Sequence, residues 1–143
     1  MKTVERAGGV VINPDQGILV VTNQLGKATL PKGRIKPGET DTMAAIREIK
    51  EESGVRNLNI VRGLGTLVRP GFEELTSTNP DVIKCIFMLL CTTHQVEVQP
   101  LADDIVGTEW VDPEEIDRVL SWPEEAAFIA ARRPELTTIG LKS

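Results

Sequence analysis

The segment "VIKCIFMLLCTT", residues 82–93, constrains the fold more than any other part of the chain. Its apolar residues occupy both alternating sets of positions, which is typical of a strand that is buried on both faces. Such a strand belongs in the middle of a sheet that is covered on both sides. Cys85 and Cys91 both lie in this run, so we interpret each as a small apolar core residue and not as half of a redox pair.

The rest of the chain predicts further strands and helices around this segment. Short apolar runs flank the turn signal "NPDQG", and Pro and Gly residues separate the later elements. The predicted strands are residues 7–12, 17–23, 58–70, 95–101 and 107–111, and the predicted helices are residues 41–53, 113–120 and 123–133. This order favours an α/β fold with a mixed sheet packed between helices. The length of 143 residues matches one domain, residues 1–143.

Composition and charge exclude several classes of function. The longest apolar run is far too short to span a bilayer, and the start "MKTVERAGG" lacks the apolar stretch of a secretory signal. We therefore expect a cytoplasmic protein with no membrane partner. The net charge of −5 argues against RNA or another nucleic acid as a partner. An anionic substrate would need a local positive device, and a bound divalent cation is one such device.

The helix predicted at residues 41–53 carries an unusual group of acids. Thr40 or Asp41 can cap its start, and Gly54 follows its last turn. Three glutamates lie on one flank of this helix, and the i,i+4 pair among them destabilises an isolated helix by about 0.2–0.5 kcal/mol. The acids are Glu48, Glu51 and Glu52.

Two interpretations of these acids are open on spacing alone. One is a solvated helix face on which Arg47 pairs with Glu51 at i+4. The other is a site for Mg²⁺ or Mn²⁺, because carboxylate oxygens suit these hard cations and the cation would turn the repulsion into attraction.

The wider stretch resembles the Nudix box. That motif is a glycine, five residues, Glu, seven residues, Arg-Glu, an aliphatic residue, any residue, Glu-Glu, any residue, glycine and an aliphatic residue. The matching positions are Gly33, Glu39, Arg47, Glu48, Ile49, Glu51, Glu52, Gly54 and Val55. The sequence "LPKG" leads into the box, and "EWV" precedes an acidic helix, as in the family. The resemblance implies an α/β/α sandwich that hydrolyses a nucleoside diphosphate linked to another moiety.

The resemblance also implies roles for the residues of the box. Glu48 and Glu52 correspond to the principal ligands of Mg²⁺, with Mn²⁺ as a substitute, and Glu51 to a further or water-mediated ligand. Arg47 resembles the arginine that orients a box glutamate, and Gly33 would let the backbone approach the metal or substrate.

Two further acids have roles that the sequence leaves open. Glu39 either supports the site or takes part in catalysis. Many family members use another acid outside the box, six residues before a tryptophan, as metal ligand or general base. With Trp110 as that tryptophan the acid is Asp104, with Asp103 and Glu109 as alternates. A solvated loop acid is an equally open interpretation of Asp104.

The sequence offers a few cations and one histidine for the remaining chemistry. Lys32, Arg34 and Arg6 are either contacts to substrate phosphates or surface charges. His94 is the only histidine, and near the end of a predicted strand we expect it to be structural or exposed, which argues against a Ser/His/Asp nucleophilic set. The chain contains no glycine-rich P-loop pattern.

The substrate is predicted by resemblance. "LPKG" before the box resembles members that act on dinucleoside polyphosphates or diphosphoinositol polyphosphates, which favours a diadenosine-polyphosphate-type hydrolase. These relatives usually carry an aromatic at the position of Lys27-Ala28. With few aromatic rings to stack a purine, we expect loose base recognition. Hydrolysis of modified nucleoside triphosphates comes second and ADP-ribose cleavage third.

A function without turnover is the competing class. A Nudix fold can serve as a nucleotide-sensing module, but such modules commonly lose box carboxylates, and here all are present. The intact box therefore favours an enzyme. Family enzymes are often dimers, so a homodimer is an open expectation, as are the bond cleaved, the number of metal ions and the general base.

Overall fold

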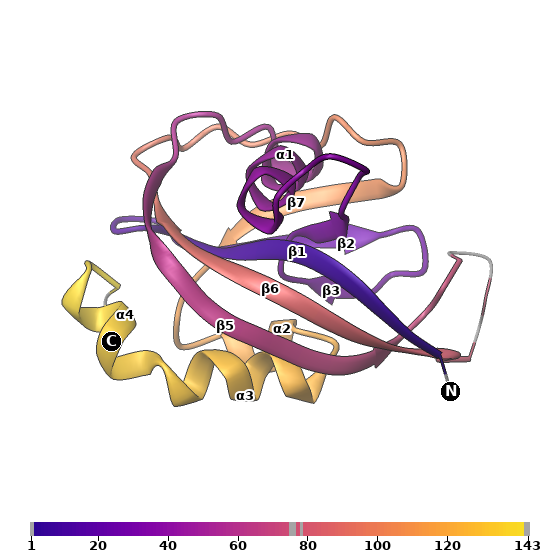
Figure 1. The fold of residues 1–143 in the computed structure, drawn as a ribbon. Helices are drawn as coiled ribbons and strands as arrows, with labels where there is room; N and C mark the ends of the chain where they lie inside the picture. The colour runs from indigo at the N-terminus through magenta and orange to yellow at the C-terminus, as the bar shows by residue number, and fades with distance from the viewer. Residues whose placement is uncertain (1, 75–76, 78, 142–143) are drawn as a thin grey trace.

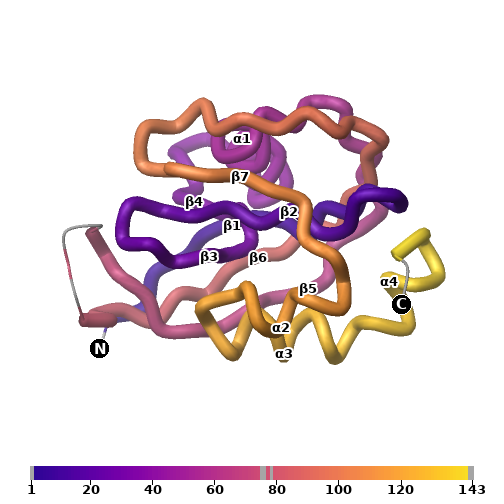
Figure 2. Tube along the Cα trace, turned by 180° about the vertical axis from the view of Figure 1, so that it is seen from behind, coloured from indigo at the N-terminus to yellow at the C-terminus, as the bar shows by residue number. Residues whose placement is uncertain are grey.

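The computed structural model describes residues 2–74, 77 and 79–141 as one twisted sheet with helices on both faces (Figure 1). The strands are β1 (Lys2–Asn13), β2 (Gly17–Asn23), β3 (Ala28–Thr29), β4 (Lys32–Arg34), β5 (Asn59–Gly71), β6 (Val82–Thr92) and β7 (Ile105–Val111). The helices are α1 (Asp41–Ser53), α2 (Ile116–Val119), α3 (Pro123–Ala131) and α4 (Arg133–Thr138). Helix α1 covers one face, and α2 and α3 lie at the other (Figures 1 and 2). The α/β/α sandwich with a mixed sheet is confirmed.

The sheet is built around a parallel pair of long strands. Its order is β3-β2-β1-β6-β5, with β4 also paired to β1 and β7 to β2. Strands β1 and β6 run parallel from the pair Lys2 and Val82 to the pair Ile12 and Thr92. The central place of β6, predicted from its apolar pattern, is confirmed.

Alternate residues of β6 enter two separate hydrophobic cores. Ile86, Met88 and Leu90 belong to the core under α2, α3 and α4. Leu89 and Cys91 belong to the core under α1. Cys91 is buried and free, and burial raises the pKa of its thiol to about 12, which agrees with a packing role.

The helix expected at residues 41–53 is confirmed to its ends. The Thr40 hydroxyl accepts a hydrogen bond from the Met43 amide at 3.1 Å and caps the first turn. Gly54 ends the helix with φ 75°, a left-handed conformation that favours glycine. The described part of the chain contains no helix with the length and apolar character of a membrane span.

The strand predicted at residues 95–101 is wrong. The amides of Gln99 and Leu101 donate to the carbonyls of Ser53 and Glu51, each at 2.8 Å. These bonds bind the segment to the C-terminal turn of α1, so the segment has no ladder with the sheet.

The C-terminal helices also differ from the prediction. Residues 113–115 form a turn, in which the Asp112 side chain accepts from the Glu114 amide at 2.9 Å, and α2 begins only at Ile116. After α3, a separate helix α4 follows that the pattern did not predict, and it buries Leu136 in the core.

Candidate active site

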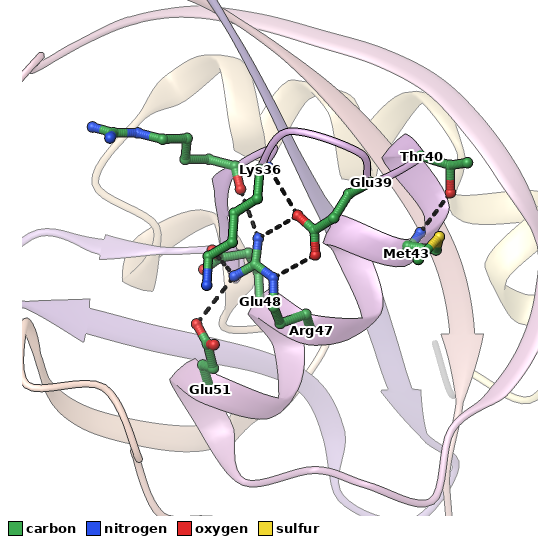
Figure 3. A network of polar contacts seen from close by, with 8 residues as sticks. Lys36, Glu39, Thr40, Met43, Arg47, Glu48 and Glu51 are labelled. Carbon is green, nitrogen blue, oxygen red and sulfur yellow. Dashed lines mark hydrogen bonds and ion pairs between the residues drawn. The ribbon is translucent and has the colours of Figure 1, made fainter.

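Arg47 of α1 is half-buried and contacts three acids of the box (Figure 3). Its Nε and Nη2 donate to the two carboxylate oxygens of Glu39, at 2.7 and 2.8 Å. Its Nη1 donates to Glu48 at 2.6 Å and to Glu51 at 3.2 Å. Its Nη2 also donates to the Arg34 carbonyl at 2.8 Å, which holds β4 against the helix. The planar guanidinium fork makes all of these bonds possible at once.

The geometry around Glu39 favours a supporting role. Both of its oxygens accept from Arg47, and one also accepts from the Lys36 amide at 2.8 Å. The hydrogen bond from Arg47, with that from Lys36, lowers the pKa of Glu39 to about 2. A carboxylate so engaged holds the loop before α1 and has little basicity for proton transfer.

Glu48 and Glu52 lie where burial makes their charge costly. Burial raises the pKa of Glu48, although Arg47 opposes the shift. Burial likewise raises the pKa of Glu52 to about 7, against the stabilising charge of Lys32. Glu52 is only 5% exposed and accepts from the Lys32 amide at 3.1 Å. Such buried, poorly compensated carboxylates are typical of functional sites.

Gly33 provides the space that Glu48 occupies. A Cβ at position 33 would lie 2.2 Å from the carboxyl carbon of Glu48, so the end of that side chain would have to move. Gly33 pairs with Ala7 in the sheet, so β4 brings this glycine against the helix by backbone pairing. Glycine suits this position because β4 and the Glu48 carboxylate approach each other closely, and not because of an unusual φ.

A cavity of about 260 Å³ opens in front of these acids. Most of the site residues predicted from the sequence line it, and they come from β1, β4, α1 and the segment before β7. They are Arg6, Lys32, Gly33, Arg34, Glu48, Glu52 and Asp104.

Two predicted residues do not line this cavity. Arg47 lies outside the cavity lining and donates a hydrogen bond to Glu48, which lines it. Glu51 accepts from Arg47 and its side chain is 42% exposed, as in the interpretation that pairs it with Arg47 at i+4. The structure thus brings Glu48 and Glu52 to the cavity and holds Glu51 beside it.

Asp104 reaches the cavity because its segment is hydrogen-bonded to α1 and to the turn after β2. The amides of Leu101 and Ala102 both donate to the Glu51 carbonyl at 2.8 Å. The Gln24 side chain donates to the Asp103 carbonyl at 3.2 Å. The two alternate acids, Asp103 and Glu109, do not line the cavity.

The sequence reasoning missed two cations of the cavity, Arg69 of β5 and Lys84 of β6. They face each other in the antiparallel ladder. Burial, together with the charges of Lys32, Arg69 and Arg6, lowers the pKa of Lys84 to about 7. The available signal was a single lysine inside an otherwise apolar central strand.

Arg69 is fixed by a buried ion pair that was also missed. Its Nε donates to Glu125 of α3 at 2.6 Å, and the two side chains are 2% and 0% exposed. The other oxygen of Glu125 accepts from the Leu30 amide at 2.7 Å. Glu125 therefore joins three elements: β5, α3 and the segment that leads to Lys32.

The donor set suits a divalent cation that also binds substrate. Among the described residues, no three acid, His or Cys side chains form a ready-made metal cage. Mg²⁺ typically takes one or two carboxylates and completes its shell with waters and substrate phosphates. Glu48, Glu52 and Asp104 at one cavity, with the cradle at Gly33, fit that mode of binding.

Comparison with known proteins defines the class. A sequence profile of the NUDIX domain matches residues 2–132. The chain therefore belongs to the NUDIX family.

Individual relatives share the sequence or the fold over different lengths. A Bacillus subtilis (strain 168) protein named for 8-oxo-dGTP diphosphatase activity is 39% identical over 66 residues. That match covers 46% of this chain and 44% of the relative, so it spans less than half of the length of either.

Two solved structures share the fold. A C. elegans Ap4A hydrolase, in a binary complex, has a TM-score of 0.75 at 23% identity and covers 94% of this chain and 98% of its own. The NUDIX domain of Shewanella oneidensis NrtR, crystallised with ADP ribose, has a TM-score of 0.70 at 16% identity, with 95% and 90% covered.

Proposed function

We propose that this protein is a metal-dependent pyrophosphohydrolase that acts on a nucleoside diphosphate derivative. The observation that carries the proposal is that carboxylates and cations line the same cavity. Glu48, Glu52 and Asp104 lie on its lining together with a set of cations. The cations are Arg6, Lys32, Arg34, Arg69 and Lys84. A pyrophosphate linkage needs both, because cations bind its oxygens and carboxylates bind the ion that assists the attack.

The residues would divide the work as follows. Glu48 and Glu52 would hold Mg²⁺ or Mn²⁺, with Glu51 as a further or water-mediated ligand. Gly33 leaves the space for the Glu48 carboxylate. When bound, the ion would neutralise phosphate oxygens and make the attacking water more acidic. Asp104 is an exposed acid of the lining, and we assign it the role of the base that accepts a proton from the attacking water.

Arg47 is a positioning residue in this scheme. It does not line the cavity but donates to Glu48, and its five hydrogen bonds fix the carboxylate relative to β4. Fixing the ligands in advance removes the cost of ordering them when the substrate binds.

For the substrate we propose a dinucleoside polyphosphate. The many cations at the cavity suit a chain of several phosphates, and the fold matches the Ap4A hydrolase over almost its whole length. A nucleoside triphosphate is the second candidate, supported by the partial match to the 8-oxo-dGTP diphosphatase. ADP-ribose is the third, since the NrtR domain was crystallised with it.

A panel of nucleotides with Mg²⁺, with the products identified by chromatography, tests this proposal. We expect metal-dependent release of nucleoside phosphates, and a loss of about 10-fold to 100-fold or more in Glu52→Gln. Glu109→Gln is the matched control, because Glu109 is an exposed acid outside the cavity lining.

Tight nucleotide binding with no metal-dependent turnover would contradict the proposal and support a sensing module. A cytoplasmic location, a single domain and a homodimer stay predictions from the sequence.

A further inference from the structure

The cavity collects two of the few aromatic rings of the chain. The sequence has three Phe, two Trp and no Tyr. Phe72, directly after β5, and Trp122, directly before α3, both line the cavity that Glu48 and Asp104 also line. Their ring centroids are 5.9 Å apart and the rings are tilted by 57°. The small number of aromatic residues in the sequence therefore does not predict the number of rings at the cavity, because the fold brings together Phe72 and Trp122, which are distant in sequence.

Trp122 is held in place before any ligand arrives. The Arg69 guanidinium carbon lies 4.7 Å from the Trp122 ring centroid, within the range of a cation–π contact. Arg69 is itself immobilised, because its Nε donates to buried Glu125 at 2.6 Å and its Nη1 to the Pro70 carbonyl at 2.8 Å. The ring consequently loses little freedom when a ligand packs on it.

A second cation, Lys27, also lies over the Trp122 ring. Lys27 Nζ lies 5.6 Å from the ring centroid, at the end of a long flexible side chain. A flat ligand that enters can displace this ammonium group, while Arg69 stays in its ion pair. Lys27 stands at the position where the sequence lacks the aromatic expected from the family resemblance. Trp122 places an indole next to that position.

We infer that Phe72 and Trp122 form a nucleobase subsite, in which the base packs on the rings while its phosphates extend toward the acids. The inference rests on the proposed function and deepens it. Both rings are partly exposed, so each presents surface to a ligand. The tilt between them excludes insertion of a base between two parallel rings, so the base packs on an open ring surface.

A comparison of nucleotides with inorganic tripolyphosphate separates base binding from phosphate binding. In Phe72→Ala and Trp122→Ala we expect KM for nucleotides to rise about 10-fold to 100-fold, with kcat within about 2-fold. The affinity for tripolyphosphate, measured by calorimetry with Mg²⁺, should stay the same. Trp122→Phe should recover most of the lost affinity. Equal losses for nucleotide and tripolyphosphate would overturn the inference.

Tryptophan fluorescence supplies a readout that does not need turnover. Trp110 lies outside the cavity lining, and its Nε1 donates to the Val96 carbonyl at 2.9 Å. Nucleotide binding should therefore quench fluorescence in Trp110→Phe as in the natural protein, but not in Trp122→Phe. Tripolyphosphate should not quench either variant.

These outcomes also separate the inference from the proposed function. If the natural protein binds nucleotides with Trp122 quenching but never hydrolyses them, the proposed function fails and the subsite stands. If hydrolysis occurs without quenching and Trp122→Ala keeps its KM, the subsite fails and the proposed function stands.

Discussion

At the scale of single residues, the site depends on how closely a backbone can approach a side chain. Gly33 lies so near Glu48 that one methyl group would overlap its carboxylate. Arg47 orients the same carboxylate by donating a hydrogen bond of 2.6 Å to it. Gly33 leaves space for the Glu48 carboxylate, and Arg47 orients it. The role of each residue therefore depends on its contact with Glu48.

Gly33→Ala should weaken binding of Mn²⁺ by at least about 10-fold, because the new methyl group must push Glu48 away from the cavity. Titration followed by electron paramagnetic resonance measures this affinity. Gly107→Ala is the matched control, since the nearest atom to its added Cβ is 3.9 Å away. Equal Mn²⁺ affinity in the two variants would show that the contact between Gly33 and Glu48 does not shape the metal site.

At the scale of elements, a buried ion pair joins parts of the chain that lie far apart in sequence. Glu125 of α3 accepts from Arg69 of β5 and from the Leu30 amide. Removing one buried charge leaves its partner uncompensated, whereas replacing both with apolar residues can be nearly neutral. The pair links β5 to α3 close to Trp122, whose ring lies against the Arg69 guanidinium.

Glu125→Leu should lower the free energy of unfolding by about 3–5 kcal/mol, because Arg69 would stay buried without its partner. The double variant Arg69→Met/Glu125→Leu should recover part of this loss, because no buried charge is left unpaired but the Leu30 amide still lacks its acceptor. Urea denaturation of the two single variants and the double variant gives the coupling energy. Additive losses would contradict a direct energetic link between the two side chains.

At the scale of the whole molecule, a net negative chain concentrates cations in one cavity. The net charge is −5, yet Arg6, Lys32, Arg69 and Lys84 line one space. Gathering these charges makes the protonated form of Lys84 unfavourable. Burial, and then its cationic neighbours, lower the pKa of Lys84 to about 7. A polyphosphate relieves this cost, because its negative charge favours the protonated amine. Protonated Lys84 thus favours substrate binding but destabilises the protein without substrate.

Lys84→Met should raise Tm by about 2–4 °C at about pH 6.5, equivalent to about 1 kcal/mol, while it weakens nucleotide binding. The pKa of Lys84 is lower in the folded than in the unfolded chain. The folded state therefore holds fewer protons between pH of about 7 and 10.5, and stability rises with pH across this window. The gain in Tm should accordingly shrink as pH increases above about 7, as calorimetric melting can show.

Binding has the opposite dependence on pH. Because the polyanion favours protonated Lys84, nucleotide affinity should fall as pH rises through about 7, and binding should take up a proton. Calorimetry in buffers of different ionisation enthalpy measures this uptake. An equal uptake in Lys84→Met would assign the proton to another group.

The sequence by itself determined the features that depend on near neighbours in the chain. Helix α1, its Thr40 cap and its Gly54 end follow from local hydrogen bonding and periodicity. The central place of β6 follows from its two apolar faces. Only the tertiary structure decided that residues 95–101 bond to α1 and that Lys84, Arg69 and Trp122 reach the cavity of the box. The physical reason is that β-sheet register and helix docking join residues distant in sequence, and no local pattern encodes their meeting.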